Sequence, residues 1–96
     1  MKFAAVCSSG LGSSFMVESN IKKVLKELDI DGIEVTHFDL GSVMRDSADV
    51  FFVGADLADS IQQKNVGEII VLNSIIDKAE LKEKVEKVCK EKNILA

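Results

Sequence analysis

Short apolar runs alternate along the chain with segments whose apolar residues recur every three or four positions. Four segments have the β-rich or continuously apolar character of strands: residues 2–6, 33–38, 50–53 and 68–72. Three segments have the spacing of amphipathic helices: residues 14–28, 55–63 and 77–90. The runs at 50–53 and 68–72 predict strands buried on both faces, whereas the partial alternation at 33–38 predicts an edge strand. Residues 40–49 fit a short helix or a loop equally well.

This alternation predicts an α/β fold. We expect a four-stranded, doubly wound parallel sheet with right-handed crossovers and helices on both faces, a Rossmann-like three-layer α/β/α arrangement. Ninety-six residues suffice for one domain, spanning residues 1–96. In such sheets ligands bind beyond the carboxyl ends of the strands, where the strand order reverses. The first strand usually lies beside that point, so its exit loop, residues 7–14, is where chemistry is expected.

Composition and charge exclude several classes of function. The net charge is −4, and the eleven Lys and single Arg are interleaved with acids, so the chain lacks the basic footprint of a nucleic-acid-binding protein. Its apolar runs are far shorter than the roughly 20 residues that span a bilayer, and no signal peptide is apparent, which predicts a cytoplasmic protein. Two cysteines 82 positions apart, without a His/Cys cluster, predict neither a disulfide framework nor a metal or cofactor site.

The predicted exit loop has the features of an anion cradle next to a nucleophile. Cys7 is followed by the proposed cradle residues Ser8, Ser9, Gly10, Leu11, Gly12, Ser13 and Ser14. The glycines allow successive N–H groups to turn inward, and the following helix adds free N–H groups and the positive end of its dipole. The same field stabilises a thiolate at Cys7. This arrangement predicts phosphoryl transfer, in which the sulfur attacks phosphorus and the amides hold the phosphoryl oxygens.

The lack of an arginine in the loop limits the kinds of phosphoryl transfer that the loop can perform. Cysteine phosphatases with this phosphatase-like P-loop plan place an Arg after five intervening residues, where its guanidinium clamps the transferring group. That position is Ser13 here, the only arginine is Arg45, and the chain has no Pro for an Asp-Pro acid loop. The loop is therefore suited to accepting and holding a phosphoryl group, which is typical of a carrier. No Gly-Lys-Ser/Thr follows the glycines, so a nucleotide-binding P-loop is not indicated.

Read as C-x-x-G-x-G-S-S, residues 7–14 closely resemble the phosphocysteine loop of the enzyme IIB components of the bacterial phosphoenolpyruvate-dependent sugar phosphotransferase system (PTS). The ascorbate and mannitol types are the nearest, and the ascorbate type is preferred over the mannitol and lactose/cellobiose types. The resemblance implies that Cys7 takes a phosphoryl group from a phosphohistidine of the IIA component and passes it to a sugar at the membrane component IIC. It implies a phosphotransferase that meets the inner face of the membrane only through IIC.

Two other classes of function stay open on the residues alone. One is a small cysteine-dependent phosphatase or arsenate-reductase-like enzyme, and the other is a non-catalytic regulatory module of the same fold. Outside the loop, we expect His37 to be structural and Cys89 to be a buried, inert thiol. Four further residues near the predicted carboxyl edge have weaker indications: Asp56 and Asp59 as solvated acids at a helix start, and Phe15 and Met16 as core or partner-docking residues.

Overall fold

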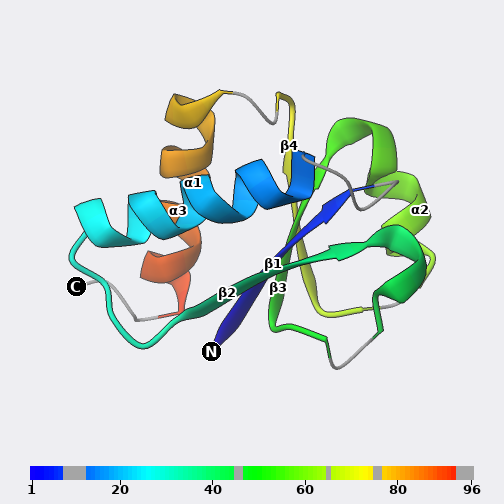
Figure 1. Cartoon of the computed structure of the whole chain (residues 1–96), viewed down its shortest axis with the longest axis horizontal. Coiled ribbons are helices and arrows are strands. Elements are labelled where there is room, and N and C mark those ends of the chain that lie inside the picture. Colours follow the sequence, from blue (N-terminus) through cyan, green and yellow to red (C-terminus); the bar gives the residue numbers. More distant parts are fainter. Residues whose placement is uncertain (8–12, 45–46, 65, 75–76, 93–96) are drawn as a thin grey trace.

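A computed structural model describes residues 1–7, 13–44, 47–64, 66–74 and 77–92. It contains one parallel sheet in the order β2-β1-β3-β4 (Figure 1). The strands are β1 (Lys2–Cys7), β2 (Glu34–Asp39), β3 (Val50–Gly54) and β4 (Glu68–Leu72). The four-stranded parallel sheet predicted from the sequence is therefore confirmed.

Helices cover both faces of the sheet and complete the predicted three layers. The α-helices are α1 (Ser13–Glu27), α2 (Ala58–Gln62) and α3 (Lys78–Glu91), and the 3₁₀ turns are η1 (Leu40–Ser42) and η2 (Ala55–Leu57). Helices α1 and α3 lie side by side on one face, and α2 lies on the other (Figure 1). The ambiguous segment at 40–49 contains η1 followed by irregular chain.

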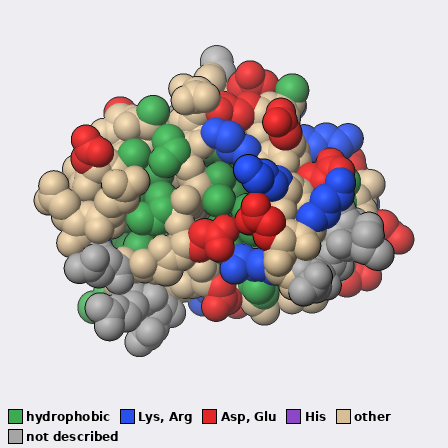
Figure 2. Space-filling view, turned by 180° about the vertical axis from the view of Figure 1, so that it is seen from behind, with side chains coloured by type: hydrophobic (Ala, Val, Ile, Leu, Met, Phe, Trp, Pro, Cys, Tyr) green, Lys and Arg blue, Asp and Glu red, His purple; other side chains and the backbone are tan. Residues whose placement is uncertain are grey.

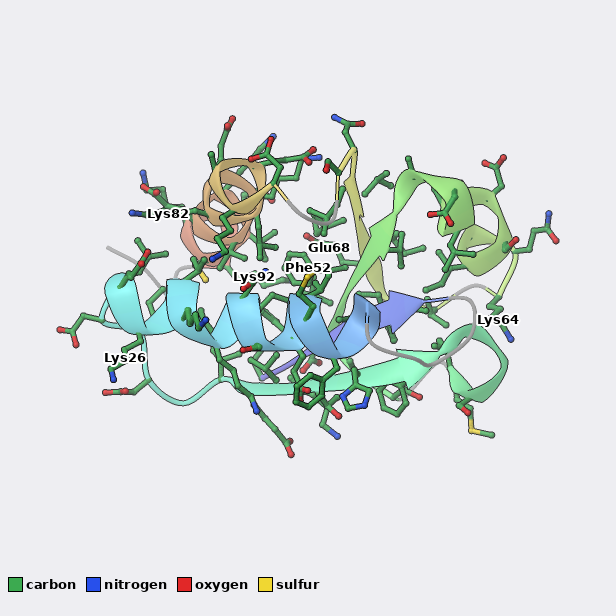
Figure 3. All side chains as sticks on the ribbon, turned by 45° about the horizontal axis from the view of Figure 1, so that its top comes forward. Lys26, Phe52, Lys64, Glu68, Lys82 and Lys92 are labelled. Atoms are coloured by element: carbon green, nitrogen blue, oxygen red, sulfur yellow. The ribbon has the colours of Figure 1, made fainter. Side chains whose placement is uncertain are left out.

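The strands pack both of their faces because successive side chains point to opposite sides. Phe52, labelled in Figure 3, lies in the larger core beneath α1 and α3. Phe3 belongs to the same core, with its ring centroid 5.4 Å from that of Phe52. Phe51 lies in the smaller core beneath α2. Burying each such ring stabilises the fold by roughly 1.5 to 3 kcal/mol. The continuous apolar run of β3 thus reflects a central strand, as predicted.

Strand β2 is an edge strand, as its partial alternation predicts, but the prediction that β4 is buried on both faces is wrong. Strand β4 forms the other edge, and Ile69, Ile70 and Val71 are only half-buried. Its run is apolar because Ile70 still packs into the larger core, and Ile69 and Val71 into the smaller one. Side-chain pattern alone does not reveal that the backbone has a partner strand on one side only.

Helix α3 protects the open edge of β4. The Lys84 ammonium donates to the carbonyl of Val71, and Lys92 Nζ lies 3.2 Å from a carboxylate oxygen of Glu68. Charged side chains at an edge strand oppose pairing with another chain. Figure 2 shows this side of the molecule, where hydrophobic side chains reach the surface over α2 and β4 and mixed charges lie over α3. None of the helices in the described parts of the chain is long and apolar enough to cross a membrane.

Candidate functional site

The carboxyl end of β1 lies where the strand order reverses. Cys7 is the last residue of β1 and is in register with Asp39 at the end of β2. On the other side, Val6 is in register with Val53 near the end of β3. The chain leaves β1 toward β2, then returns past β1 to form β3, so the backbone of Cys7 stands at the switch point expected to carry ligands.

The next described residue after Cys7 is the first residue of a long helix. Helix α1 begins at Ser13, runs for 15 residues, and has no acidic residue in its first turn. Its positive dipole end is therefore not neutralised by a carboxylate of its own first turn, which favours an anion there. Of the predicted cradle, Ser13 and Ser14 open α1, whereas Ser8, Ser9, Gly10, Leu11 and Gly12 lie outside the described residues.

A hydrogen-bonded pair joins the start of α1 to β2 near this end of the sheet. His37 Nδ1 lies 2.8 Å from Glu18 Oε2, and because a carboxylate only accepts, the ring donates its Nδ1–H. Glu18 is almost buried and is also 3.5 Å from Lys22 Nζ. His37 thus has the structural contact expected of it. Glu18 is absent from the sequence-based candidates, since no local pattern reveals a pairing across 19 positions.

Phe15 stands out on the surface beside this pair. Its side chain is 61% exposed, and its ring lies nearly perpendicular to the His37 ring, at an interplanar angle of 78° and with centroids 5.8 Å apart. Met16 is half-buried. Of the two roles predicted for these residues, core packing does not describe Phe15.

The remaining sequence candidates are two exposed acids that follow β3 at the same carboxyl edge of the sheet, and one buried thiol. Asp56 and Asp59 are exposed, in η2 and in the first turn of α2, as predicted for solvated acids at helix starts. Cys89 is fully buried in the larger core, and desolvation raises the pKa of its thiol, in agreement with the predicted inert cysteine. No group of three or more potential metal ligands occurs among the described residues.

Charged and polar contacts around Glu80, which we call the clamp, hold the chain just after the carboxyl end of β4. Glu80 accepts hydrogen bonds from the backbone N–H groups of Asn73 and Ser74, each at 2.9 Å, and from Lys84 Nζ at 2.9 Å. The two backbone bonds and the lysine lower the pKa of the Glu80 carboxyl to about 2. Asp77 caps α3 by accepting from the Glu80 N–H. The clamp anchors the start of α3 to the sheet.

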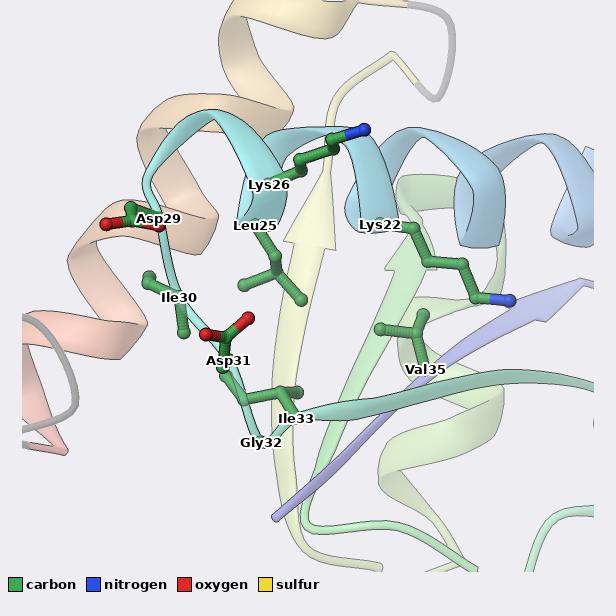
Figure 4. Close-up of a pocket in the computed structure, with 9 residues that line it drawn as sticks. All are labelled: Lys22, Leu25, Lys26, Asp29, Ile30, Asp31, Gly32, Ile33 and Val35. Atoms are coloured by element: carbon green, nitrogen blue, oxygen red, sulfur yellow. The ribbon is translucent and has the colours of Figure 1, made fainter.

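A groove of about 350 Å³ lies at the opposite end of β2, between that strand and the end of α1 (Figure 4). Lys22 and Lys26 reach it from α1, and its apolar floor includes Ile30 and Val35, each 8% exposed. The turn beside it has a left-handed residue at Asp29, with φ 57°. Because β2 runs from this groove toward Asp39, the groove is remote from Cys7 and takes no part in chemistry there.

Comparison with known proteins identifies the family. A family model described as "PTS system, Lactose/Cellobiose specific IIB subunit" matches residues 2–87. The chain belongs to this family. It is also 25% identical over 85 residues to the ascorbate-specific PTS system EIIB component of Mycoplasma pneumoniae (strain ATCC 29342 / M129 / Subtype 1), a match that covers 88% of this chain and 90% of that protein. The predicted membership of the IIB components is confirmed, while the two matches name different sugars.

A solved structure shares the fold. It is described as "YwlE arginine phosphatase - C7S mutant with phosphorylated active site serine", and it superposes with a TM-score of 0.61, covering 97% of this chain and 96% of that chain. At 11% sequence identity the likeness shows a phosphatase-like α/β fold and nothing of the activity. Membership of the IIB family makes the chain a phosphoryl-transfer component of sugar uptake, and such components work with IIA and IIC partners.

Proposed function

We propose that Cys7 is the phosphorylated residue, and that the protein carries the phosphoryl group from a phosphohistidine of IIA to a sugar at IIC. The observation that supports this most strongly is the position of Cys7, at the end of a central strand and six positions before the first residue of a helix whose first turn lacks acids. The positive helix end favours the thiolate over the thiol and favours the phosphorylated state that follows.

Two displacements make up the transfer. The Cys7 thiolate attacks phosphorus, a P–S bond forms, the P–N bond of the phosphohistidine breaks, and the imidazole leaves. A sugar hydroxyl then attacks the same phosphorus, the P–S bond breaks, the thiolate returns, and the hydroxyl proton passes to a base of the acceptor complex. The cradle of residues 8–14 offers N–H and O–H groups to the phosphoryl oxygens in both steps.

The absence of an arginine in the loop supports a carrier over a phosphatase. Ser13, the first residue of α1, stands where a phosphatase of this plan has its Arg, and the only arginine is Arg45 in another segment. Without the guanidinium, the loop lacks the group that stabilises the charge on the transferring phosphoryl during attack by water. The phosphocysteine therefore persists until IIC presents its sugar.

We assign ascorbate as the sugar, and the inner face of the membrane as the place of transfer. The similarity to the ascorbate-specific relative extends over 88% of the chain and supports this type, although the family description names lactose and cellobiose. The protein is cytoplasmic and reaches the membrane by binding IIC. Phosphorylation assays with membranes that contain IIC, supplied in turn with ascorbate, mannitol, lactose and cellobiose, test the type. Transfer to lactose or cellobiose and not to ascorbate would overturn it.

Intact-mass and peptide analysis after incubation with phosphoenolpyruvate, the general PTS proteins and the cognate IIA tests the central proposal. We expect one added phosphoryl group on Cys7, and none on a Cys7→Ala variant. Cys89→Ala is the matched control, because its thiol is buried in the core, and it should be phosphorylated like the parent chain. Phosphorylation of another residue, or none at all, contradicts the proposal.

A phosphatase or a regulatory module would give different results. Steady hydrolysis of an aryl phosphate without IIA would support the phosphatase, and sugar uptake that survives Cys7→Ala would support the regulatory module. The carrier predicts at most single-turnover release from the aryl phosphate and complete loss of uptake in that variant.

A further inference from the structure

A groove of about 240 Å³ separates α1 from α3 on the face that these helices share. Its α1 side is formed by Asn20, Lys23, Val24 and Glu27. Its α3 side is formed by the first helical residues, Lys78 and Ala79, and by Lys82. Figure 3 shows Lys82 on the side of α3 that lies above the carboxyl-terminal half of α1.

Asn20 provides an unsatisfied polar group in the wall of this groove. The residue is 7% exposed, yet its side-chain amide makes no hydrogen bond with any residue that the structure describes. A buried amide without a partner costs free energy, so such groups are rare unless a water or a ligand completes them. Its –NH₂ supplies two donors to whatever occupies the groove.

The charge of the groove favours an anion. Three lysines and one glutamate line it, and Lys82 Nζ lies 3.7 Å from a carboxylate oxygen of Glu27. Lys23 and Lys78 have no ion pair within the described chain, so the lining carries a net charge of about +2 on a protein whose total is −4. The groove also meets the amino-terminal end of the 14-residue α3, but Asp77 caps that end and Glu80 lies in its first turn, so the lysines rather than the helix dipole supply the favourable charge.

We propose that this groove binds a small organic phosphate monoester. A dianion matches the two unpaired lysines better than a monocarboxylate does, the Asn20 amide donates to a phosphate oxygen, and Val24 and Ala79 offer apolar contact to the organic part. The site is separate from the Cys7 loop and does not depend on the function proposed for that residue. Because residues of both α1 and α3 line the groove, a bound ligand contacts α1, the helix that follows the Cys7 loop, and α3 at the same time.

The test is an NMR titration of the ¹⁵N-labelled chain with glycerol 3-phosphate. The sequence has only six Asn and Gln residues, so the side-chain NH₂ pair of Asn20 can be assigned by its loss in Asn20→Leu. We expect saturable shifts of that NH₂ pair and of the Lys78 and Ala79 backbone amides, with a Kd of about 1 mM for a site of this size. Separate titrations with glycerol, with sodium chloride at matched ionic strength, and with lactate serve as controls.

A double variant, Lys23→Gln with Lys78→Gln, should weaken this titration about tenfold or more, because it removes two charge-assisted contacts. Lys87→Gln, which changes an exposed lysine of α3 outside the groove, should leave it unchanged. Phosphate binding at the Cys7 loop would shift residues 8–14 in every variant and is distinguished in that way. No shift at Asn20, equal shifts with sodium chloride, or equal affinity for lactate would overturn the proposal.

Discussion

Replacing Asn20 with Leu should stabilise the protein while it abolishes phosphate binding in the groove between α1 and α3. A buried amide without a partner costs about 1 to 3 kcal/mol, and Leu forms helix better than Asn by a few tenths of a kcal/mol. The groove is open on one side, so water offsets part of that cost, and the extra methyl groups of Leu have room in about 240 Å³. We expect a net gain of about 1 to 2 kcal/mol, or about 4 to 16 °C in Tm for a domain of this size.

Urea unfolding followed by circular dichroism measures this gain, since the chain has no Trp or Tyr to report by fluorescence. The midpoint should rise at constant m-value, which assigns the change to stability rather than to a different denatured state. Asn73→Leu, at an exposed position, should change the free energy of unfolding by no more than about 0.5 kcal/mol. Destabilisation by Asn20→Leu would refute the reasoning, because it would mean that the native amide is already well satisfied.

Three further results are expected. Cys89 should resist iodoacetamide at pH 7 in the native state and react only after unfolding, as read by peptide mass analysis, because it is fully buried and burial raises its pKa; native labelling would contradict this. Glu80→Gln should be less stable than the parent chain at pH 7, as measured by urea unfolding. This difference in stability should shrink as pH falls from 4.5 toward 2, because the pKa of Glu80 is lowered in the fold and only its ionised carboxylate stabilises the fold. A pH-independent difference would argue against the clamp. Phe52→Ala should cost about 3 to 5 kcal/mol by urea unfolding, whereas Phe15→Ala, on the surface, should cost less than about 0.5 kcal/mol; equal losses would contradict the assigned burial.

The sequence predicts the fold well because its strongest signals are local. The apolar run at residues 50–53 becomes the central strand β3, and the amphipathic spacing at residues 77–90 becomes helix α3, since both signals depend on residues close together in the sequence. The position of β4 at an edge is not predicted, because its side chains pack on both faces while only its backbone lacks a second partner strand. Likewise, the His37–Glu18 contact joins a strand to a helix across 19 positions, and no periodicity encodes it.

The two candidate sites differ in the kind of signal that reveals them. The Cys7 loop is recognisable from residue types and spacing, because glycines, serines and a nucleophile between a strand and a helix define the chemistry before any geometry is known. The groove depends on where α3 crosses α1, and the sequence holds only a weak sign of it. Asn20 falls within the apolar stripe of its helix, three positions after Val17 and four before Val24. A polar residue in such a stripe destabilises the fold unless its polar atoms form hydrogen bonds, so the presence of Asn20 there is a reason to look for a ligand.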